Sequence, residues 1–570
     1  MFFCDNYPDG PDLFKIIDKI EIDKKITEHK NHFCFFEKKF DTGCINYLLH
    51  NNNLLIDVNN NCSLNLFLDM RKIHDFDDKG RIYELKKKDN KIIIHYKKYK
   101  DDSLKTLLYK RFCVLKTKSD VILKNNWKEV FYKKDKQRNS LINKLWVYHG
   151  LQLDIKNNER IVFSYSDKLD EAIKNADDTY HRFDSIFNKE IVFSNNHYDL
   201  SLKGKEISFA YLCAKKSLND LYCNINQTKG ILAGFPWFFQ VWARDEAISL
   251  GAYIRQLRLH SVKNILNRQL NNFRYDGRIH NRFPYSGLAS ADSSGWMFFR
   301  LYEFLVVLKQ HNLLSDLYTL KDIEIFDHKL DFSIHQHIKY YLEDNLITNF
   351  KLETWMDTHH KTDTREGQRI EIQALFLAML KLSVFLKTEL KKDTRYHEKI
   401  LDDVKEAVIT HFFTGKILKD GKNDDTIRPN IFIANYVFPD LLKKKDWTKV
   451  FVNSLDKLWL SWGGLSSIQK DSELFCSVYT GENNQSYHRG DSWFWVNNLA
   501  AICLHKTDKK LFKKFIEKIV SASTRDILYC GAIGNHSEIS SASKQTADGC
   551  LSQAWSNAMY IEMIKEIFNH

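Results

Sequence analysis

Residues Lys351 to Leu390 read KLETWMDTHHKTDTREGQRIEIQALFLAMLKLSVFLKTEL, a short acidic and aromatic segment directly ahead of an unusually apolar stretch. From about Gly367 to Leu386 the apolar residues fall on every face of the predicted helix, which indicates that the helix is buried on most sides. Asp363 and Glu366, three residues apart, have the spacing of helix-capping side chains. The loop before this helix therefore delivers polar side chains into a protein core.

Asp357 is the candidate catalytic residue of this loop, although a carboxylate before a helix usually caps the helix or faces water. Trp355, two residues earlier, favours a functional role for Asp357. A tryptophan beside a carboxylate offers an apolar face to a sugar ring and a low-dielectric wall that raises the pKa of the carboxyl group. We therefore expect Trp355 to contact substrate and a second catalytic carboxylate to lie elsewhere in the chain.

The composition is that of an ordinary soluble protein with 570 residues, 44% hydrophobic residues, 14% aromatic residues and a formal net charge of +12. A chain of this length predicts two domains. The positive charge comes from lysines spread through segments such as ELKKKDNKIIIHYKKYK, without an arginine-rich arm or a recognisable nucleic-acid module. We interpret it as a compositional bias and expect no nucleic-acid partner, with nucleic-acid binding as a minor alternative.

The cysteines and the hydropathy pattern bear on the compartment. Eleven cysteines without CxxC spacing predict free thiols in a reducing cytoplasm. The first residues lack a basic segment followed by an apolar run, and nowhere do about eighteen uninterrupted apolar residues occur. We therefore expect a cytoplasmic protein that does not contact a membrane.

Two domains with different periodicity follow each other along the chain. Residues 1–191 contain short runs with period-two alternation and polar turns, which predict an N-terminal β-sandwich domain ending in a helical connector at about 167–191. Residues 192–570 contain about eleven or twelve helical segments in paired layers, which predict a closed ring with its loops around a funnel. The predicted helices start near Ser208, Arg244, Ala289, Asp327, Gln368, Tyr396, Asn430, Trp447, Asp491, Lys509 and Gly549.

The loop at residues 233–256 reads AGFPWFFQVWARDEAISLGAYIRQ and contains Trp237, Trp242, Arg244 and Asp245. The simplest interpretation is a helix start with a local Arg–Asp pair. The functional interpretation is that Arg244 and Asp245 bind adjacent sugar hydroxyls through charge-assisted hydrogen bonds while the tryptophans stack on the ring.

Three further loops precede apolar helices. Asp292 lies ahead of Trp296 at a helix start, where we expect a structural cap with a supporting role near the site. Residues 486–502 (SYHRGDSWFWVNNLAAI) and 531–559 mix glycines with Trp, His and carboxylates. Glu538, in a Gly- and Ser-rich loop without an adjacent basic residue, is the candidate second carboxylate.

Metal and cysteine chemistry are the alternatives for catalysis. His359 and His360 lie beside Asp357, and His280 lies in another loop, but adjacent histidines rarely bind one ion together and no HExxH or CxxC spacing occurs. A cysteine nucleophile has no evident basic partner. We expect neither a metal nor another cofactor.

Five motifs occur in order from Ala233 almost to the C-terminus: AGFPWF…WARDE, ETWMDT…REGQRIEIQAL, RPNIFIAN, YHRGDSWFWVNN and SEIS…DGCLSQAWS. Together they resemble the archaeal and bacterial type of glycogen debranching enzyme, the amylo-alpha-1,6-glucosidase family; a weaker match is LFLDMRKIHDF at residues 66–76. The resemblance implies an N-terminal β-sandwich domain followed by an (α/α)6 barrel related to glucoamylases, with hydrolysis that inverts the anomeric centre.

The resemblance also implies roles for individual residues. Asp357 becomes the general acid and Glu538 the general base, while Arg244 lowers the pKa of Asp245, whose task is to hold hydroxyls. Glu371 is a further substrate-contact candidate and, with Glu353, an alternative base. The complete set of predicted substrate-binding residues is Trp237, Trp242, Arg244, Asp245, Trp355, Glu371, His488, Asp491, Trp493, Gln553 and Trp555.

The expected function is removal of α-1,6-linked glucose from branch points of glycogen or another branched α-glucan. Two alternatives stay open: a related exo-α-glucosidase acting on α-1,4 ends or a disaccharide, and a glucan-binding protein without turnover. An additional transferase would need a (β/α)8 barrel of about 250 residues. Only about 190 residues precede the helical part, so we expect hydrolysis without transfer.

Overall fold

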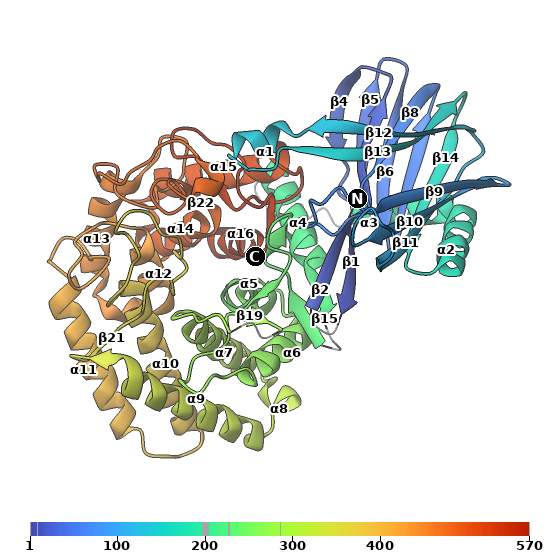
Figure 1. Ribbon diagram of the computed structural model, residues 1–570. Coiled ribbons are helices and arrows are strands. Elements are labelled where there is room, and N and C mark those ends of the chain that lie inside the picture. The colour runs from blue at the N-terminus through green and yellow to red at the C-terminus, as the bar shows by residue number, and fades with distance from the viewer. Residues whose placement is uncertain (1, 8–9, 197–203, 226–227, 285–286, 569–570) are drawn as a thin grey trace. The chain divides into compact units, whose positions relative to one another are not determined.

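The computed structural model describes residues 2–7, 10–196, 204–225, 228–284 and 287–568. Its chain forms two compact units, one comprising Met1–Tyr7 and Pro11–Asp199 and the other comprising Pro8–Gly10 and Leu200–His570 (Figure 1). The first unit is rich in strands and the second is helical, so the predicted order of fold classes is confirmed. None of the described helices is long and apolar enough to cross a membrane.

Two antiparallel sheets form the first unit, apart from the short pair β1 (Phe2–Tyr7) and β2 (Gly10–Lys15). The larger sheet has the order β4-β5-β6-β7-β14-β11-β10-β9, and the smaller has the order β12-β13-β8-β3. The bounds of the strands are β3 (Ile17–Ile22), β4 (Ile26–Asn31), β5 (Phe36–Phe40), β6 (Gly43–His50), β7 (Asn53–Asn59), β8 (Cys62–Leu68), β9 (Arg81–Lys88), β10 (Lys91–Tyr99), β11 (Leu107–Lys116), β12 (Asp120–Phe131), β13 (Lys144–Ile155) and β14 (Glu159–Ser166).

Alternating burial explains how these strands form a sandwich. In β10 every second residue is buried, so that Ile92, Ile94 and Tyr96 join one core together with residues from both sheets. The opposite face of the larger sheet is covered by α2 (Leu169–His181) and α3 (Phe183–Asn196), which pack through small and aromatic residues. A short helix, α1 (Lys133–Gln137), lies between β12 and β13.

Twelve longer helices of the described second unit alternate between an outer and an inner layer. The inner helices are α5 (Ala243–Arg255), α7 (Ser293–Gln310), α10 (Ile370–Glu389), α12 (Asn430–Val437), α14 (Phe494–Asp508) and α16 (Ala554–Phe568). The outer helices are α4 (Lys205–Asp220), α6 (Leu259–Leu270), α9 (Leu320–Tyr341), α11 (Arg395–Phe412), α13 (Lys444–Leu458) and α15 (Lys513–Tyr529). Each inner helix contacts the next, and α16 contacts α5, so the inner ring closes into the expected (α/α)6 barrel (Figure 1).

Burial separates the two layers as the sequence predicts. Helix α10 is buried along most of its surface, whereas α11 buries a single stripe. Two helix predictions were wrong: α6 was missed, and α9 begins at Leu320 instead of near Asp327 because Thr319 and Asp322 form a capping box.

Short strand pairs lie in the loops that enter the inner helices, and three of them (β17–β24, β18–β19 and β22–β23) join two different loops. These strands are β15 (Tyr222–Ile225), β16 (Thr228–Ile231), β17 (Gly234–Phe235), β18 (Val241–Trp242), β19 (Arg282–Phe283), β20 (Leu342–Glu343), β21 (Leu346–Ile347), β22 (Ser492–Trp493), β23 (Ile539–Ser540) and β24 (Ser552–Gln553). The β17–β24 pair joins the loop before the first inner helix to the loop before the last. The remaining short elements are α8 (Leu314–Leu317), η1 (Pro439–Leu441) and η2 (Gly481–Asn483).

Four inner helices meet at a buried ion pair. Arg300 of α7 donates to Glu562 of α16 at 3.0 Å, and Tyr436 of α12 donates to the other oxygen of Glu562 at 2.6 Å. Gly251 of α5 faces this pair so closely that a Cβ atom there would overlap Glu562 and Arg300. A glycine at this position therefore lets α5 approach the other helices.

We expect Gly251→Ala to lower the free energy of unfolding by about 2–4 kcal/mol, because the added methyl group must displace a buried ion pair. Chemical denaturation measures the loss. Ser249→Ala, a buried change on the same helix that removes one hydrogen bond to a backbone carbonyl, should cost about 1 kcal/mol. Equal stability of Gly251→Ala and the wild type would contradict this account of helix packing.

Candidate active site

The predicted site residues lie at the starts of inner helices or in the loops that precede them. Arg244 and Asp245 are in the first turn of α5, Asp357 precedes α10, and Asp491 precedes α14. Glu538 precedes β23, whose partner strand β22 leads directly into α14. Contacts between these loops bring most of the candidates together.

Arg244 connects three of the loops. Its Nε donates to both oxygens of Asp292 at 2.7 and 2.9 Å, and its Nη1 lies 3.4 Å from Oδ2 of Asp357. The predicted capping role of Asp292 is wrong, because its side chain makes no hydrogen bond to the backbone of α7. Asp292 instead holds the Arg244 guanidinium next to Asp357, and Ser290 donates to Asp292 at 2.6 Å.

Asp357 is an accessible carboxyl group among buried neighbours. Its side chain is 40% exposed, whereas that of Arg244 is 4% exposed. The surrounding protein desolvates the carboxylate and raises its pKa above the usual value; Arg244 acts in the opposite direction, and the charge of Asp292 adds to the rise. A carboxyl with these properties is suited to donate a proton.

Asp245 corrects one expectation about electrostatics. Arg244 does lower its pKa, as expected, but desolvation outweighs that effect, and the charges of Glu538 and Asp357 also raise the pKa, to about 8. Asp245 is therefore neutral over most of the physiological pH range. Its electrostatic interaction with both Asp357 and Glu538 indicates that the three carboxyl groups surround one region.

Glu538 is held by hydrogen bonds that favour an ionised carboxylate. Tyr487 donates its hydroxyl to Oε1 at 2.5 Å, and the backbone N–H of Cys550 donates to Oε2 at 2.8 Å. Gly549, with a φ of +65°, leaves room for this carboxylate, because a Cβ atom there would overlap it. Tyr487 was missed by sequence reasoning, although it precedes His488 in the YHRGDSW motif.

A second anchor positions the segment that carries Glu538. His536 lies 2.7 Å from the buried Asp526 of α15, and the backbone N–H of Ser537 donates to the same carboxylate oxygen at 2.8 Å. Both residues immediately precede Glu538, so the outer helix fixes the backbone from which the candidate base projects.

Trp355 was expected to face a sugar ring, and the structure places it differently. The residue is 2% exposed, and its ring packs edge-to-face against His488, Trp493 and Trp495 at centroid distances of 5.1–5.6 Å. Its Nε1 donates to Asn430 at 2.7 Å. Trp355 thus anchors the loop of Asp357 in the core and is too buried for its ring to stack on a sugar.

His488 and Asp491 are buried titratable groups in the loop before α14. His488 stacks on Trp493 at 5.0 Å, and desolvation together with neighbouring arginines lowers its pKa well below the usual value. Desolvation raises the pKa of Asp491 well above its usual value, although Ser486 donates to one oxygen at 2.7 Å. The other Asp491 oxygen and Nε2 of His488 have no hydrogen-bond partner among the described residues.

Glu371 was expected at the substrate, but its two oxygens are already bound. Arg365 donates to them at 2.6 and 3.1 Å, and Glu371 is 1% exposed. The same Arg365 also pairs with Asp420 at 2.9 Å.

Asp363 was expected to cap α10, but its side chain accepts hydrogen bonds from Arg428 and Arg489 at 2.9 and 2.7 Å. These residues fix the loop of Asp357 and are not available to substrate.

The remaining candidates are Gln553, Trp555, Trp242 and Trp237. Gln553 donates to Asp245 at 3.3 Å, and Trp555 stacks on Trp495 at 5.0 Å. Nε1 of Trp242 and Nε1 of Trp555 are buried without a hydrogen-bond partner among the described residues. Trp237 is half-buried in the segment between β17 and β18. Orphaned polar atoms of this kind are typical of a site that binds a polar ligand.

Asp245→Asn tests the electrostatic account of this region. Because the folded protein binds the Asp245 proton with a pKa of about 8, against an ordinary value of 3.8, the contribution to stability is complete below about pH 4 and is lost as pH rises through 8. Between pH 5 and 8 we expect the free energy of unfolding to fall more steeply with pH in the wild type than in the variant. The two slopes should differ by about 1 kcal/mol per pH unit. Denaturant titrations at several pH values measure this, with the exposed Asp402→Asn as a control. Parallel pH profiles for Asp245→Asn and the wild type would contradict the raised pKa.

Comparisons with known proteins identify the fold and the family of this chain. The family model described as amylo-alpha-1,6-glucosidase matches residues 208–562. Among solved structures, a bacterial glucoamylase complexed with acarbose superposes with a TM-score of 0.62 and 13% sequence identity, covering 98% of this chain and 90% of the glucoamylase chain. A search of curated protein sequences found no significant match. The fold is thus glucoamylase-like, and the chain belongs to the amylo-alpha-1,6-glucosidase family of glycoside hydrolases.

Proposed function

We propose that this glycoside hydrolase removes single α-1,6-linked glucose units from branch points of glycogen-like glucans by an inverting acid–base mechanism. The observation that carries the proposal is the contrast between two carboxyl groups. Asp357 is accessible and has a raised pKa, whereas Glu538 accepts hydrogen bonds from Tyr487 and a backbone N–H. Environments that differ in this way supply one acid and one base.

In the proposed reaction, protonated Asp357 donates to the oxygen of the leaving chain while the glycosidic bond breaks. Glu538 accepts a proton from a water molecule, which attacks the anomeric carbon from the opposite face of the ring. One displacement of this kind inverts the configuration. It requires the two carboxyl groups to lie about 6.5–9.5 Å apart, with room for water between them.

The other residues hold the terminal sugar in this scheme. Arg244 donates to Asp292 and contacts Asp357, so it keeps the acid oriented and binds a hydroxyl group nearby. Neutral Asp245 both donates to and accepts from hydroxyl groups, because its carboxyl is protonated below about pH 8. Trp242 and Trp555 present indole N–H groups, and His488, Asp491, Trp493, Gln553 and Trp237 complete the proposed binding site.

The linkage preference is tested by measuring glucose release from panose, isomaltose, maltose and two limit dextrins. We expect rapid release from panose and from a dextrin with single-glucose stubs, because the proposed site takes one α-1,6-linked unit. Branches several units long should give no lengthened main chains. Maltose as the best substrate would favour the exo-α-glucosidase alternative, and binding of every glucan without release would favour a non-catalytic protein.

Substitutions separate the proposed roles. Asp357→Asn and Glu538→Gln should each lower kcat by about 10²–10⁴-fold, the usual contribution of a positioned acid or base. Arg244→Ala should raise KM as well as lower kcat, since its sugar contact exists before the transition state. Steady-state kinetics measure both effects, with circular dichroism as the control for folding. A folded Glu538→Gln enzyme with near-normal kcat would remove Glu538 from the mechanism.

The stereochemistry of the first product is a separate test. We expect β-glucose from the α-linked substrate, because water attacks the face opposite to the leaving oxygen. Proton NMR during the first minutes, before mutarotation, distinguishes the anomers. Initial formation of α-glucose would show that the mechanism retains configuration.

A further inference from the structure

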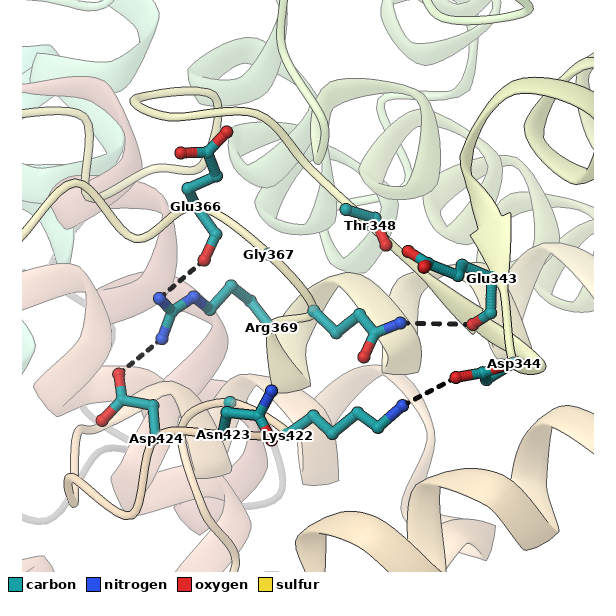
Figure 2. Close-up of a pocket in the computed structure, with 11 residues that line it drawn as sticks. Glu343, Asp344, Thr348, Glu366, Gly367, Arg369, Lys422, Asn423 and Asp424 are labelled. Atoms are coloured by element: carbon teal, nitrogen blue, oxygen red, sulfur yellow. Dashed lines mark hydrogen bonds and ion pairs between the residues drawn. The ribbon is translucent and has the colours of Figure 1, made fainter.

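A polar pocket of about 380 Å³ lies beside the loop of Asp357 and is not part of the catalytic arrangement. Its walls come from three segments at the same end of the barrel: the β20–β21 hairpin, residues 366–369 before α10, and residues 421–424 before α12. Figure 2 shows these segments converging around Arg369. The volume is in the range of small-ligand sites, about 300–1,000 Å³.

Two ion pairs hold the walls of the pocket. Arg369 contacts Asp424 at 2.5 Å, and Lys422 contacts Asp344 at 3.1 Å (Figure 2). Arg369 also lies 3.3 Å from Asp420, the partner of Arg365. The pocket is therefore a defined feature that shares a buried carboxylate with the network supporting the loop of Asp357.

Other side chains at the pocket remain open to a ligand. The carboxylates of Glu343 and Glu366 and the amide of Asn423 have no hydrogen-bond partner among the described residues (Figure 2). Free carboxylates repel a phosphate. Within the described ranges, no group of His, Cys, Asp and Glu has the geometry of a metal site. The lining carries four carboxylates (Glu343, Asp344, Glu366 and Asp424) and two cations (Arg369 and Lys422), so the pocket disfavours an anion. Its free carboxylate acceptors and its amide suit a neutral ligand rich in hydroxyl groups.

Exposed aromatic rings continue this surface. Asn349 and Gly367 form an isolated antiparallel β-bridge. The next residues along the two segments, Phe350 and Glu366, therefore lie opposite each other. Phe350 is 58% exposed, and its ring centroid lies 6.2 Å from that of Tyr341. Tyr340 and Tyr275 continue the row, with 6.3 Å between the centroids of Tyr341 and Tyr340 and again between those of Tyr340 and Tyr275. Tyr340 is 46% exposed and Tyr275 is 76% exposed. Exposed rings in a row beside polar groups are typical of a sugar-binding surface.

The row has a rigid support. The Arg278 guanidinium stacks on Tyr341 at 3.6 Å and pairs with Glu353 at 2.8 Å. The hydroxyl of Tyr341 donates to Asp276 at 2.8 Å. Because Glu353 precedes Asp357 by four residues, the aromatic row and the candidate acid are attached to the same loop.

We propose that this pocket and the aromatic row, formed by Tyr275, Tyr340, Tyr341 and Phe350, bind an α-glucan chain at a second site outside the catalytic one. The inference rests on the proposed function for its substrate class. A second site holds the polymer near the catalytic centre while the branch reacts, and so raises the effective concentration of branch points. It contributes nothing to the binding of a trisaccharide that fills only the catalytic site.

The test compares Phe350→Ala/Glu366→Ala with Tyr396→Ala/Glu398→Ala, a matched exposed pair on the outer helix α11. Glycogen affinity is measured by native electrophoresis in gels with and without glycogen, and kcat/KM is measured with panose. We expect the pocket variant to bind glycogen roughly five- to twenty-fold more weakly, with panose kinetics unchanged. The α11 variant should match the wild type in both assays.

Three outcomes separate the two proposals. Unchanged glycogen affinity of the pocket variant overturns the second site, and so does a parallel loss of kcat/KM on panose, which would place these residues in the catalytic site. If the wild type hydrolyses none of the α-glucosides while the pocket variant still loses glycogen affinity, the second site stands and the proposed function falls.

Discussion

The Arg365 guanidinium is the constraint on which the loop of Asp357 depends. It is buried and paired with Glu371 on α10 and with Asp420 before α12, and Asn430 extends the contacts from Asp420 to Trp355. Removal of one partner from a buried ion pair costs about 3–5 kcal/mol because the other charge is left uncompensated. The loop of Asp357 has little regular secondary structure, so its shape depends on this network.

Crowding of carboxyl groups determines which of them carries the charge. Asp245, Asp357 and Asp491 all have raised pKa values, mainly from desolvation, and the charge of Glu538 contributes for Asp245 and Asp491. One ionised carboxylate in such a group raises the pKa of its neighbours. Glu538, with two donors directed at it, is the group best able to remain ionised. The proposed division into acid and base thus rests on unequal hydrogen bonding.

Sequence patterns predicted the elements of this protein better than its contacts. The inner helices and the loops before them were predictable, because burial on all sides appears as an apolar run within each element. Pairing over long separations was not, since Arg244 and Asp292 lie 48 residues apart and Arg365 has two acidic partners where the sequence offers many acids. Trp355 was expected at the surface of the site, but the rings that bury it come from a distant segment. Tyr487 carried a local signal in its motif that was overlooked.

The β17–β24 pair has a consequence for biosynthesis. It joins residues near 234 to residues near 552, so the ring of inner helices closes only when the last of them, α16, is available. During synthesis from the N-terminus, Asp245 leaves the ribosome some 300 residues before its partner Gln553. Long-range closure of this kind is slow compared with local helix formation. The nascent barrel is therefore an open arc whose apolar inner faces remain uncovered until α16 has been synthesised. Transiently exposed apolar surface of this kind makes a folding intermediate prone to aggregation.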